Sequence, residues 1–277
     1  MQRTGDCMNT MELIRHRRSV RTFDGRALLP EDAERILSFA ESAANPYGIG
    51  ISWKLLSAAD ERLSVPVITG ADTYIAGKMG RKPHAEEAFG YSFEKIVLFA
   101  ESLGIGTTWI AGPMDRAAFE RAMELKKDEV MPCISPLGYP SDRMSIRETL
   151  MRKGIKADSR MEFSSLFFEG DFETPLIEER AAGLMNALEM VRFAPSAVNR
   201  QPWRVVVTGE AAHFYEKQSR GYVSGDGWDI QKIDIGIAMR HFACGLEEAG
   251  RPFDVAVRDP GLSVPQDIRY VSTFVLR

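Results

Sequence analysis

Cysteine and histidine are scarce in this sequence, which has three cysteines and four histidines among 277 residues. The cysteines, Cys7, Cys133 and Cys244, are odd in number and far apart. Their spacing argues against a disulfide framework, a zinc site or an iron–sulfur cluster. No metal is therefore expected, and the low cysteine content fits a protein of the reducing cytoplasm.

Long apolar runs and an excess of one charge are also missing. The first residues lack the apolar core of a signal peptide, and no stretch approaches the roughly 20 apolar residues that cross a bilayer. The 35 basic residues stand against 39 acidic ones, without a long block of either sign. These absences argue against a nucleic acid or a membrane as partner, and they favour a small-molecule substrate.

The apolar content of 44% is enough for a substantial core. Apolar spacing predicts helices over residues 30–44, 91–103 and 178–193, and a helix that Asp115 caps and that runs to Leu125. Strands are expected at residues 54–57, 107–110, 131–137 and 204–208. Ser145 and Glu148 have the spacing of a capping box. The pattern predicts an α+β fold.

The order of elements restarts near Pro175, which suggests an internal duplication. Ala44 and Trp53 match Ala194 and Trp203 at one common offset. Gly90, Glu101 and Gly104 match Gly236, Glu247 and Gly250 at a slightly shorter offset. Chance similarity of short segments is the alternative, but the repeated order of helix, loop, tryptophan and strand favours duplication. We expect two related halves, residues 1–170 and 171–277, that share one core.

Two segments carry side chains suited to a large anionic, planar ligand. Residues 17–23, RRSVRTF, bring three guanidinium groups and a hydroxyl together, which suits a phosphate, although such clusters more often form a solvated face. Residues 194–203, APSAVNRQPW, form a proline-stiffened loop between a helix and a strand. Its Asn199 and Gln201 could read the donors and acceptors of a flavin's pyrimidine edge.

RRSVRTF and APSAVNRQPW together resemble the two cofactor motifs of the FMN-dependent nitroreductase family. The segments GYSFEKIVLFAESLGIGTTWIAG and SPLGYP are also similar to that family's pattern. In the family, the cofactor lies between two subunits, one of which supplies the arginine motif and the other the loop. This chain has one copy of each motif, in different halves. The resemblance therefore implies an intramolecular pseudo-dimer of the tandem subgroup, built from a mixed β-sheet and long helices, with one shared FMN site; the chain could then be a monomer.

The resemblance also implies roles for individual residues. Arg17, Arg18 and Ser19 would hold the phosphate and ribityl chain, with Arg21 near flavin N1 and O2. The segment TTWIAG would bring the backbone of Ala111 and Gly112 to flavin N5, where Gly112 allows close approach. Arg147 is the candidate for a further phosphate ligand, with Arg143 nearly as plausible. The second half would contribute Pro195, Ser196, Asn199 and Gln201 to the ring.

No protein nucleophile is expected, because the flavin itself would carry the chemistry. His241 lies in a segment of helical apolar spacing and reads as a buried structural residue. Trp109, Trp203 and Trp228 could stack on the ring, but large aromatic residues near strands more often belong to the core, as does Cys244. Pro113 departs from the expected pattern, since it removes a backbone donor just after the N5 segment.

Three functions fit these observations. The first is an NAD(P)H-dependent reductase of nitroaromatic, quinone or related electron-poor acceptors. The second is a flavin-binding sensor or carrier without turnover, and the third is a specialised relative such as a reductive dehalogenase. The reductase is favoured. The choice between NADH and NADPH is not encoded in a readable motif, because the sequence has no Gly-rich dinucleotide fingerprint to inspect.

Overall fold

The computed structural model describes residues 9–181, 183–223, 225 and 227–277, so Cys7 lies outside the described residues. The α-helices are α1 (Thr10–His16), α2 (Pro30–Ser42), α3 (Ala58–Glu61), α4 (Ala85–Ser102), α5 (Arg116–Ala122), α6 (Ile146–Gly154), α7 (Met185–Phe193) and α8 (Ile230–Glu248). Short 3₁₀ turns cover η1 (Phe163–Ser165) and η2 (Ala197–Asn199). The expected α+β fold is confirmed.

The strands form two sheets. They are β1 (Ser52–Ser57), β2 (Thr73–Gly80), β3 (Glu129–Val130), β4 (Ile134–Leu137), β5 (Phe167–Glu169), β6 (Trp203–Thr208), β7 (Ala211–Lys217), β8 (Phe253–Ala256) and β9 (Ile268–Leu276). In the first sheet, β2 pairs antiparallel with β1, β3 and β4. The second sheet has the order β5-β6-β7-β9-β8 and is mixed, because β5 runs parallel to β6.

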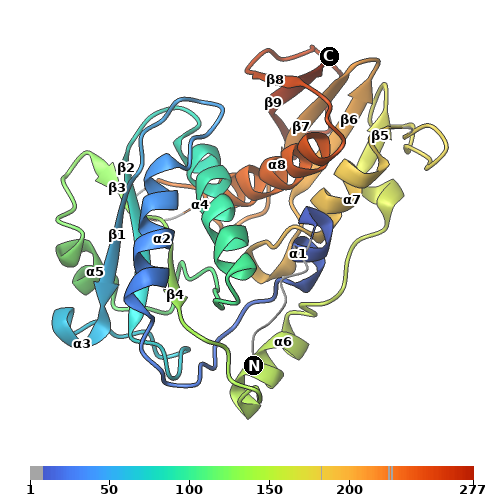
Figure 1. Ribbon diagram of the computed structural model, residues 1–277. Coiled ribbons are helices and arrows are strands. Elements are labelled where there is room, and N and C mark those ends of the chain that lie inside the picture. The colour runs from blue at the N-terminus through green and yellow to red at the C-terminus, as the bar shows by residue number, and fades with distance from the viewer. Residues whose placement is uncertain (1–8, 182, 224, 226) are drawn as a thin grey trace.

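The two halves repeat one arrangement. A strand that begins with or near a tryptophan, β1 or β6, pairs with a central strand, β2 or β7, which pairs in turn with β4 or β9. A long helix, α4 or α8, follows each central strand, and these two helices cross between the two sheets (Figure 1). One cluster of buried side chains contains residues of both halves, among them Ile36, Phe93, Phe214 and Phe242.

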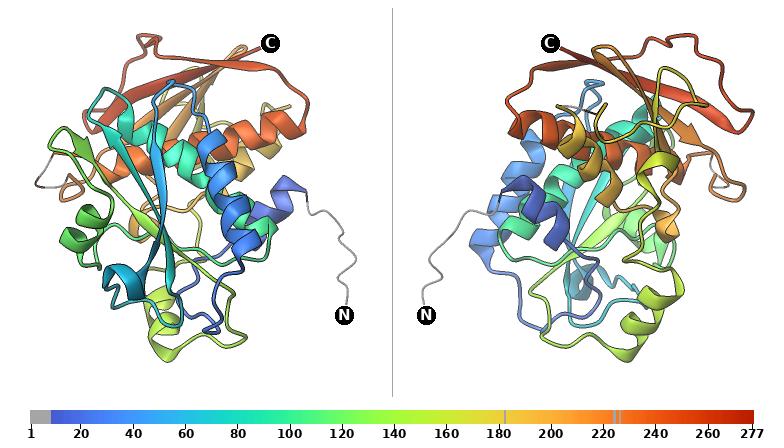
Figure 2. Two further views of the ribbon diagram at one scale, coloured as in Figure 1. Left: turned by 60° about the vertical axis from the view of Figure 1, so that its left-hand side comes forward. Right: turned by 90° about the vertical axis from the view of Figure 1, so that its right-hand side faces the viewer.

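Two segments of the first half reach into the second half. Strand β5 lies before residue 170, yet it pairs Phe167 with Val205 of β6. Helix α1 contacts α7 and α8 as well as α4 (Figure 2). The halves are therefore interlocked, and no extended linker separates them within the described residues.

Several expected boundaries need correction. The helix predicted from residue 91 begins at Ala85. The helix predicted from residue 178 begins only at Met185, because Gly183 takes a left-handed conformation with φ of +75°. The strand predicted at residues 131–137 is shorter and begins at Ile134, since the carbonyls of Met131 and Pro132 accept from the Arg116 guanidinium and not from a neighbouring strand. The helix after Asp115 ends at Ala122.

The capping box is only half formed. Ser145 accepts from the Glu148 N–H at 3.1 Å, as predicted. The Glu148 carboxylate instead accepts from the Thr22 hydroxyl at 2.7 Å and faces Arg18, so it ties α6 to the arginine segment.

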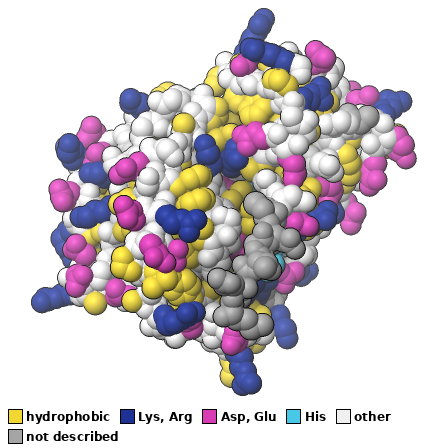
Figure 3. All heavy atoms as spheres, viewed as in Figure 1, with side chains coloured by type: hydrophobic (Ala, Val, Ile, Leu, Met, Phe, Trp, Pro, Cys, Tyr) yellow, Lys and Arg dark blue, Asp and Glu magenta, His cyan; other side chains and the backbone are white. Residues whose placement is uncertain are grey.

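The surface carries both signs of charge. Basic and acidic side chains are mixed over the face shown in Figure 3, without an extended patch of one sign. Within the described residues, no helix combines the length and the apolar character needed to cross a membrane.

Candidate functional site

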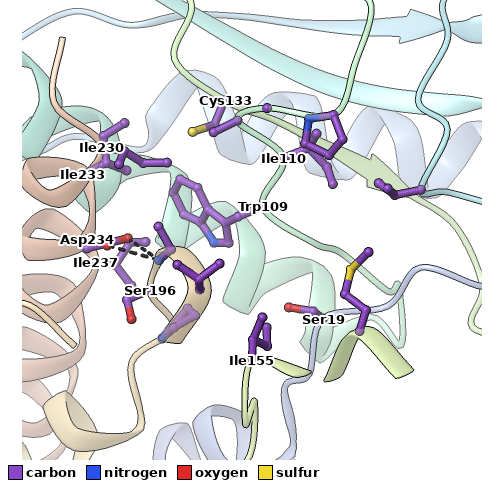
Figure 4. A pocket seen from close by; sticks show the side chains of 18 of the residues that line it. Ser19, Trp109, Ile110, Cys133, Ile155, Ser196, Ile230, Ile233, Asp234 and Ile237 are labelled. Atoms are coloured by element: carbon purple, nitrogen blue, oxygen red, sulfur yellow. Dashed lines mark hydrogen bonds between the residues drawn. The ribbon is translucent and has the colours of Figure 1, made fainter. Parts of the chain in front are cut away.

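A cavity of about 420 Å³ lies where the two halves meet (Figure 4). The first half lines it with the arginine segment, the TTWIAG segment and α6, and the second half with the 195–198 loop and α8. Most of the lining side chains are apolar. They include Val67, Trp109, Ile110, Met151, Ile155, Val198, Ile230, Ile233 and Ile237. We call this space the main cavity.

The arginine segment is held against the TTWIAG segment by backbone contacts. Ser19 forms a parallel bridge with Thr107, and the Val20 N–H donates to the Thr107 carbonyl at 2.9 Å. Gly106 permits this approach, because a Cβ there would lie 3.0 Å from Val20 and from Pro140. The arginine segment thus lines the main cavity with Ser19 and Arg21. The TTWIAG segment, which lies beside it, lines the cavity with Ala111 and Gly112.

A smaller hollow of about 70 Å³ adjoins the main cavity and shares Ser19, Ile155, Pro195 and Ser196 with it. We call it the arginine cavity. It is lined by four arginines, Arg17, Arg18, Arg152 and Arg160, and by Asn199.

Four of the five arginines that line the two cavities keep nitrogen atoms without a hydrogen-bond acceptor, whereas Arg152 is bonded to Asp158, which also lines the arginine cavity. These buried atoms are Nε and Nη1 of Arg17, Nη1 of Arg18, Nε and Nη1 of Arg21, and Nε of Arg160. Burial and then the nearby Arg17 lower the pKa of Arg160, and burial also lowers the pKa of Arg21. Cationic donors without acceptors are groups that an anion can bind.

The loop that follows α7 has an unusual backbone. Val198, Asn199 and Gln201 have φ values of +44°, +57° and +51°, which is rare for residues with a Cβ and most costly for a β-branched valine. The Ala197 N–H donates to both carboxylate oxygens of Asp234 at 3.1 Å. The Ser196 hydroxyl accepts from the Gln201 N–H at 2.9 Å.

The two amides of this loop do not face the main cavity as we expected. The Asn199 amide donates to the carbonyls of Lys156 and Ser159 at 2.7 and 3.0 Å, although the residue does line the arginine cavity. Gln201 is buried, lines neither cavity, and accepts from the Met161 N–H at 2.9 Å. Both amides therefore fasten the loop to residues 156–161, a segment whose approach no local motif could predict.

The basic residue expected after SPLGYP is also placed elsewhere. The Arg147 guanidinium donates to the Pro66 carbonyl at 2.8 Å and lines neither cavity. Arg143 borders a separate surface hollow. Arg152 of α6, rather than either of them, lines the arginine cavity, where its guanidinium is bonded to Asp158.

Asp234 is a site residue that sequence reasoning missed. It is 3% exposed, lies on α8 among Ile230, Ile233 and Ile237, and lines the main cavity. Burial raises its pKa well above the usual value of an aspartate. The only signal in the sequence was one acidic residue on an otherwise apolar helix face.

Glu94 is the second missed residue, and it lies against one lining residue of each cavity, Trp109 and Arg17. It is fully buried in α4, and its carboxylate accepts from the Trp109 indole N–H at 3.1 Å. The same carboxylate lies 2.9 Å from His241 Nε2 and 3.9 Å from Arg17 Nε. His241 is buried, as predicted, and its Nδ1 lies 2.8 Å from the Met190 carbonyl oxygen. Trp109 lines the main cavity, whereas Trp203 belongs to the core.

In the first half, the loop that corresponds to the one after α7 carries a large side chain, Tyr47. Tyr47 stands at the position equivalent to Ala197, and it stacks on His84 with ring centroids 4.9 Å apart and planes 3° apart. Its hydroxyl lies 2.7 Å from the Ser272 hydroxyl of β9. The large Tyr47 ring therefore stands where the second half of the repeat has the small side chain of Ala197, which lines the main cavity.

Comparison with known proteins agrees with this architecture. The family described as "Putative TM nitroreductase" matches residues 9–246. The crystal structure of a "putative nitroreductase" from Thermotoga maritima is 24% identical, with a TM-score of 0.64, over 100% of this chain and 96% of that one. A nitroreductase family protein from Clostridium novyi, 19% identical, has a TM-score of 0.42 and covers 49% of this chain and 87% of its own. An FMN-dependent nitroreductase from Clostridium difficile, 18% identical, has a TM-score of 0.42 and covers 48% and 88%.

No curated protein matches the sequence. The match to the family model nevertheless extends over most of the chain, from α1 to α8, and therefore includes the arginine segment, TTWIAG and the 195–201 loop. The chain belongs to this nitroreductase family.

Proposed function

We propose that the chain is an FMN-dependent oxidoreductase that binds one FMN across the two cavities. The observation that carries the proposal is the set of buried guanidinium nitrogens without acceptors beside an apolar cavity. A phosphate would supply acceptors to Arg17, Arg18 and Arg160, and the ring system would fill the main cavity.

The polar groups of the main cavity suit the two ends of a flavin ring. Arg21 would lie near N1 and O2 and stabilise the negative charge that reduction places there. Ala111 and Gly112 would lie at the N5 edge. Pro195 and Ser196, which line both cavities, would contact the ring and the ribityl chain from the second half. FMN would supply the redox chemistry, hydride transfer through N5 from NADH or NADPH to an electron-poor acceptor such as a nitroaromatic or a quinone.

One FMN per chain follows from the distribution of these groups. The arginines come from the first half and the 195–198 loop from the second, while Tyr47 fills the equivalent place in the first half. Because both contributions lie in one polypeptide, we propose that a monomer is sufficient for binding.

Reconstitution with FMN tests the proposal. The purified chain is titrated with FMN, and the flavin released on denaturation is compared with protein concentration, with an expected ratio of one. The holoprotein is then mixed anaerobically with NADH or with NADPH, and bleaching of the flavin spectrum should be followed by reoxidation with a nitroaromatic or a quinone. Binding without reduction by either donor would favour a sensor or carrier, and turnover confined to halogenated acceptors would favour a dehalogenase.

A further inference from the structure

Arg116, the first residue of α5, donates to three backbone carbonyls, one of which belongs to Ala111 in the wall of the main cavity. Its Nη2 donates to the Ala111 carbonyl at 2.6 Å and to the Pro132 carbonyl at 3.1 Å. Its Nη1 donates to the Met131 carbonyl at 2.7 Å. The guanidinium thus fastens the TTWIAG segment to the chain just before Cys133, and both segments line the main cavity. A planar fork with several donors is suited to this task, and a lysine is not.

The contact with Ala111 fixes the direction of the next N–H. In a trans peptide the carbonyl and the following N–H point in opposite directions. Because the Ala111 carbonyl is turned toward Arg116, the Gly112 N–H is turned away from it. No hydrogen bond within the described part of the chain uses this N–H, and Gly112 lines the main cavity.

The turn around Gly112 leaves few alternative donors. Pro113 has no N–H, and the Met114 N–H donates back to the Gly112 carbonyl at 2.8 Å. Arg116 is itself held from the second half, since its guanidinium carbon lies 5.6 Å from the centre of the Trp228 ring. The peptide between Ala111 and Gly112 is therefore locked by contacts from both halves.

We propose that Arg116 is a positioning residue that aims the Gly112 N–H at the N5 edge of the bound flavin. This inference rests on the proposed function and adds a residue that lies outside the cavity lining. A fixed donor at N5 lowers the barrier to hydride uptake only if its direction is set beforehand. Arg116 sets it through the carbonyl on the other side of the same peptide.

The test compares Arg116→Met and Arg116→Lys with Arg121→Met, which removes an exposed arginine from the same helix. Each protein is loaded with ¹⁵N-labelled FMN, and the N5 chemical shift, the FMN dissociation constant and the rate of reduction by saturating NADH or NADPH are measured. In Arg116→Met the N5 resonance should move toward its position in a solvent without N–H donors. The reduction rate constant should fall about tenfold, less than for outright loss of a donor. Arg116→Lys should lie between, and Arg121→Met should match the parent.

The FMN dissociation constant should stay within about threefold of the parent, because the arginine cavity is untouched. An unchanged N5 shift and rate in both Arg116 variants would overturn the inference. So would loss of FMN binding together with a lower melting temperature in both variants, which would assign Arg116 to folding alone. Failure of the parent protein to bind FMN would instead reject the proposed function, so the two failures are distinguishable.

Discussion

Gly90 of α4 and Gly236 of α8 lie against each other where the two long helices cross. A Cβ atom added to Gly90 would stand 3.2 Å from the Gly236 Cα and would overlap the Ile233 carbonyl oxygen. A Cβ added to Gly236 would overlap the Glu87 carbonyl oxygen in the same way. The two positions matched each other in the sequence repeat, so the pair lies on the approximate axis that relates the halves.

Gly90→Ala should therefore destabilise the protein by about 3 kcal/mol, the upper end of the usual cost of overpacking, because the added Cβ would meet the backbone of the other helix. The free energy of unfolding is measured by urea denaturation. Gly154→Ala is the matched control, since a Cβ at Gly154 meets no atom within 4 Å, and this helical position should tolerate or favour alanine. Equal stability of the two variants would contradict the close crossing.

Arg18→Ala should raise the FMN dissociation constant about tenfold, because a charge-assisted hydrogen bond to the phosphate would be lost. Arg147→Ala serves as the control, and we expect a change of less than about twofold because that side chain lines neither cavity. Fluorescence titration with FMN measures both constants. A larger effect at Arg147 than at Arg18 would mean that Arg147 binds the phosphate, as the sequence resemblance implied.

Arg21→Ala should slow flavin reduction by about tenfold or more, because no fixed cation would then stabilise the charge that develops at N1 and O2. Arg26→Ala should have little effect. The Arg26 guanidinium is bonded to Asp24 and lies 4.6 Å over the Tyr139 ring, outside both cavities. Stopped-flow absorbance reports the rate, and identical rates and FMN occupancy in both variants would remove Arg21 from the site.

Glu216 should make the protein less stable as the pH rises. Burial, then the neighbouring Asp229, raises the pKa of Glu216 to about 7, with Lys232 opposing the shift and Glu87 adding to it. The folded state therefore holds a proton that the unfolded state releases near pH 4.5, so this stabilisation is complete at low pH and is lost as the pH passes 7. Glu216→Gln should flatten the melting temperature between pH 5 and pH 8, and an unchanged slope would exclude Glu216 as its source.

Tyr47→Ala should lower the free energy of unfolding by about 3 kcal/mol, since a stacked, largely buried ring is removed. Tyr47→Phe should cost only about 1 kcal/mol, the usual value of the hydrogen bond to Ser272. FMN stoichiometry should remain one in both variants, because the sequence of the second half has no counterpart of RRSVR to hold a second phosphate. Two FMN per chain in Tyr47→Ala would show that the tyrosine alone had closed a second site.

The sequence predicted the parts of the site that continuous motifs form. It did not predict the contacts between residues that lie far apart in the chain. RRSVRTF, TTWIAG and the 194–203 loop were identified because each motif is continuous, and Ser19, Ala111 and Ser196 do line the main cavity. Asp234 and Glu94 were missed, because their partners come from other elements. The directions of Asn199 and Gln201 depend on positive φ angles and on residues 156–161, so composition of the loop could not predict them.

Strand β5 has a consequence for synthesis on the ribosome. Its partner β6 is made later, so the nascent first half emerges with Phe167 and its neighbours unpaired. The glycine surface of α4 likewise stays uncovered until α8 has been made. Exposed strand edges and apolar surface of this kind are what chaperones bind. A chain stalled after β5 should therefore stay bound to a chaperone, and release should require the second half to emerge.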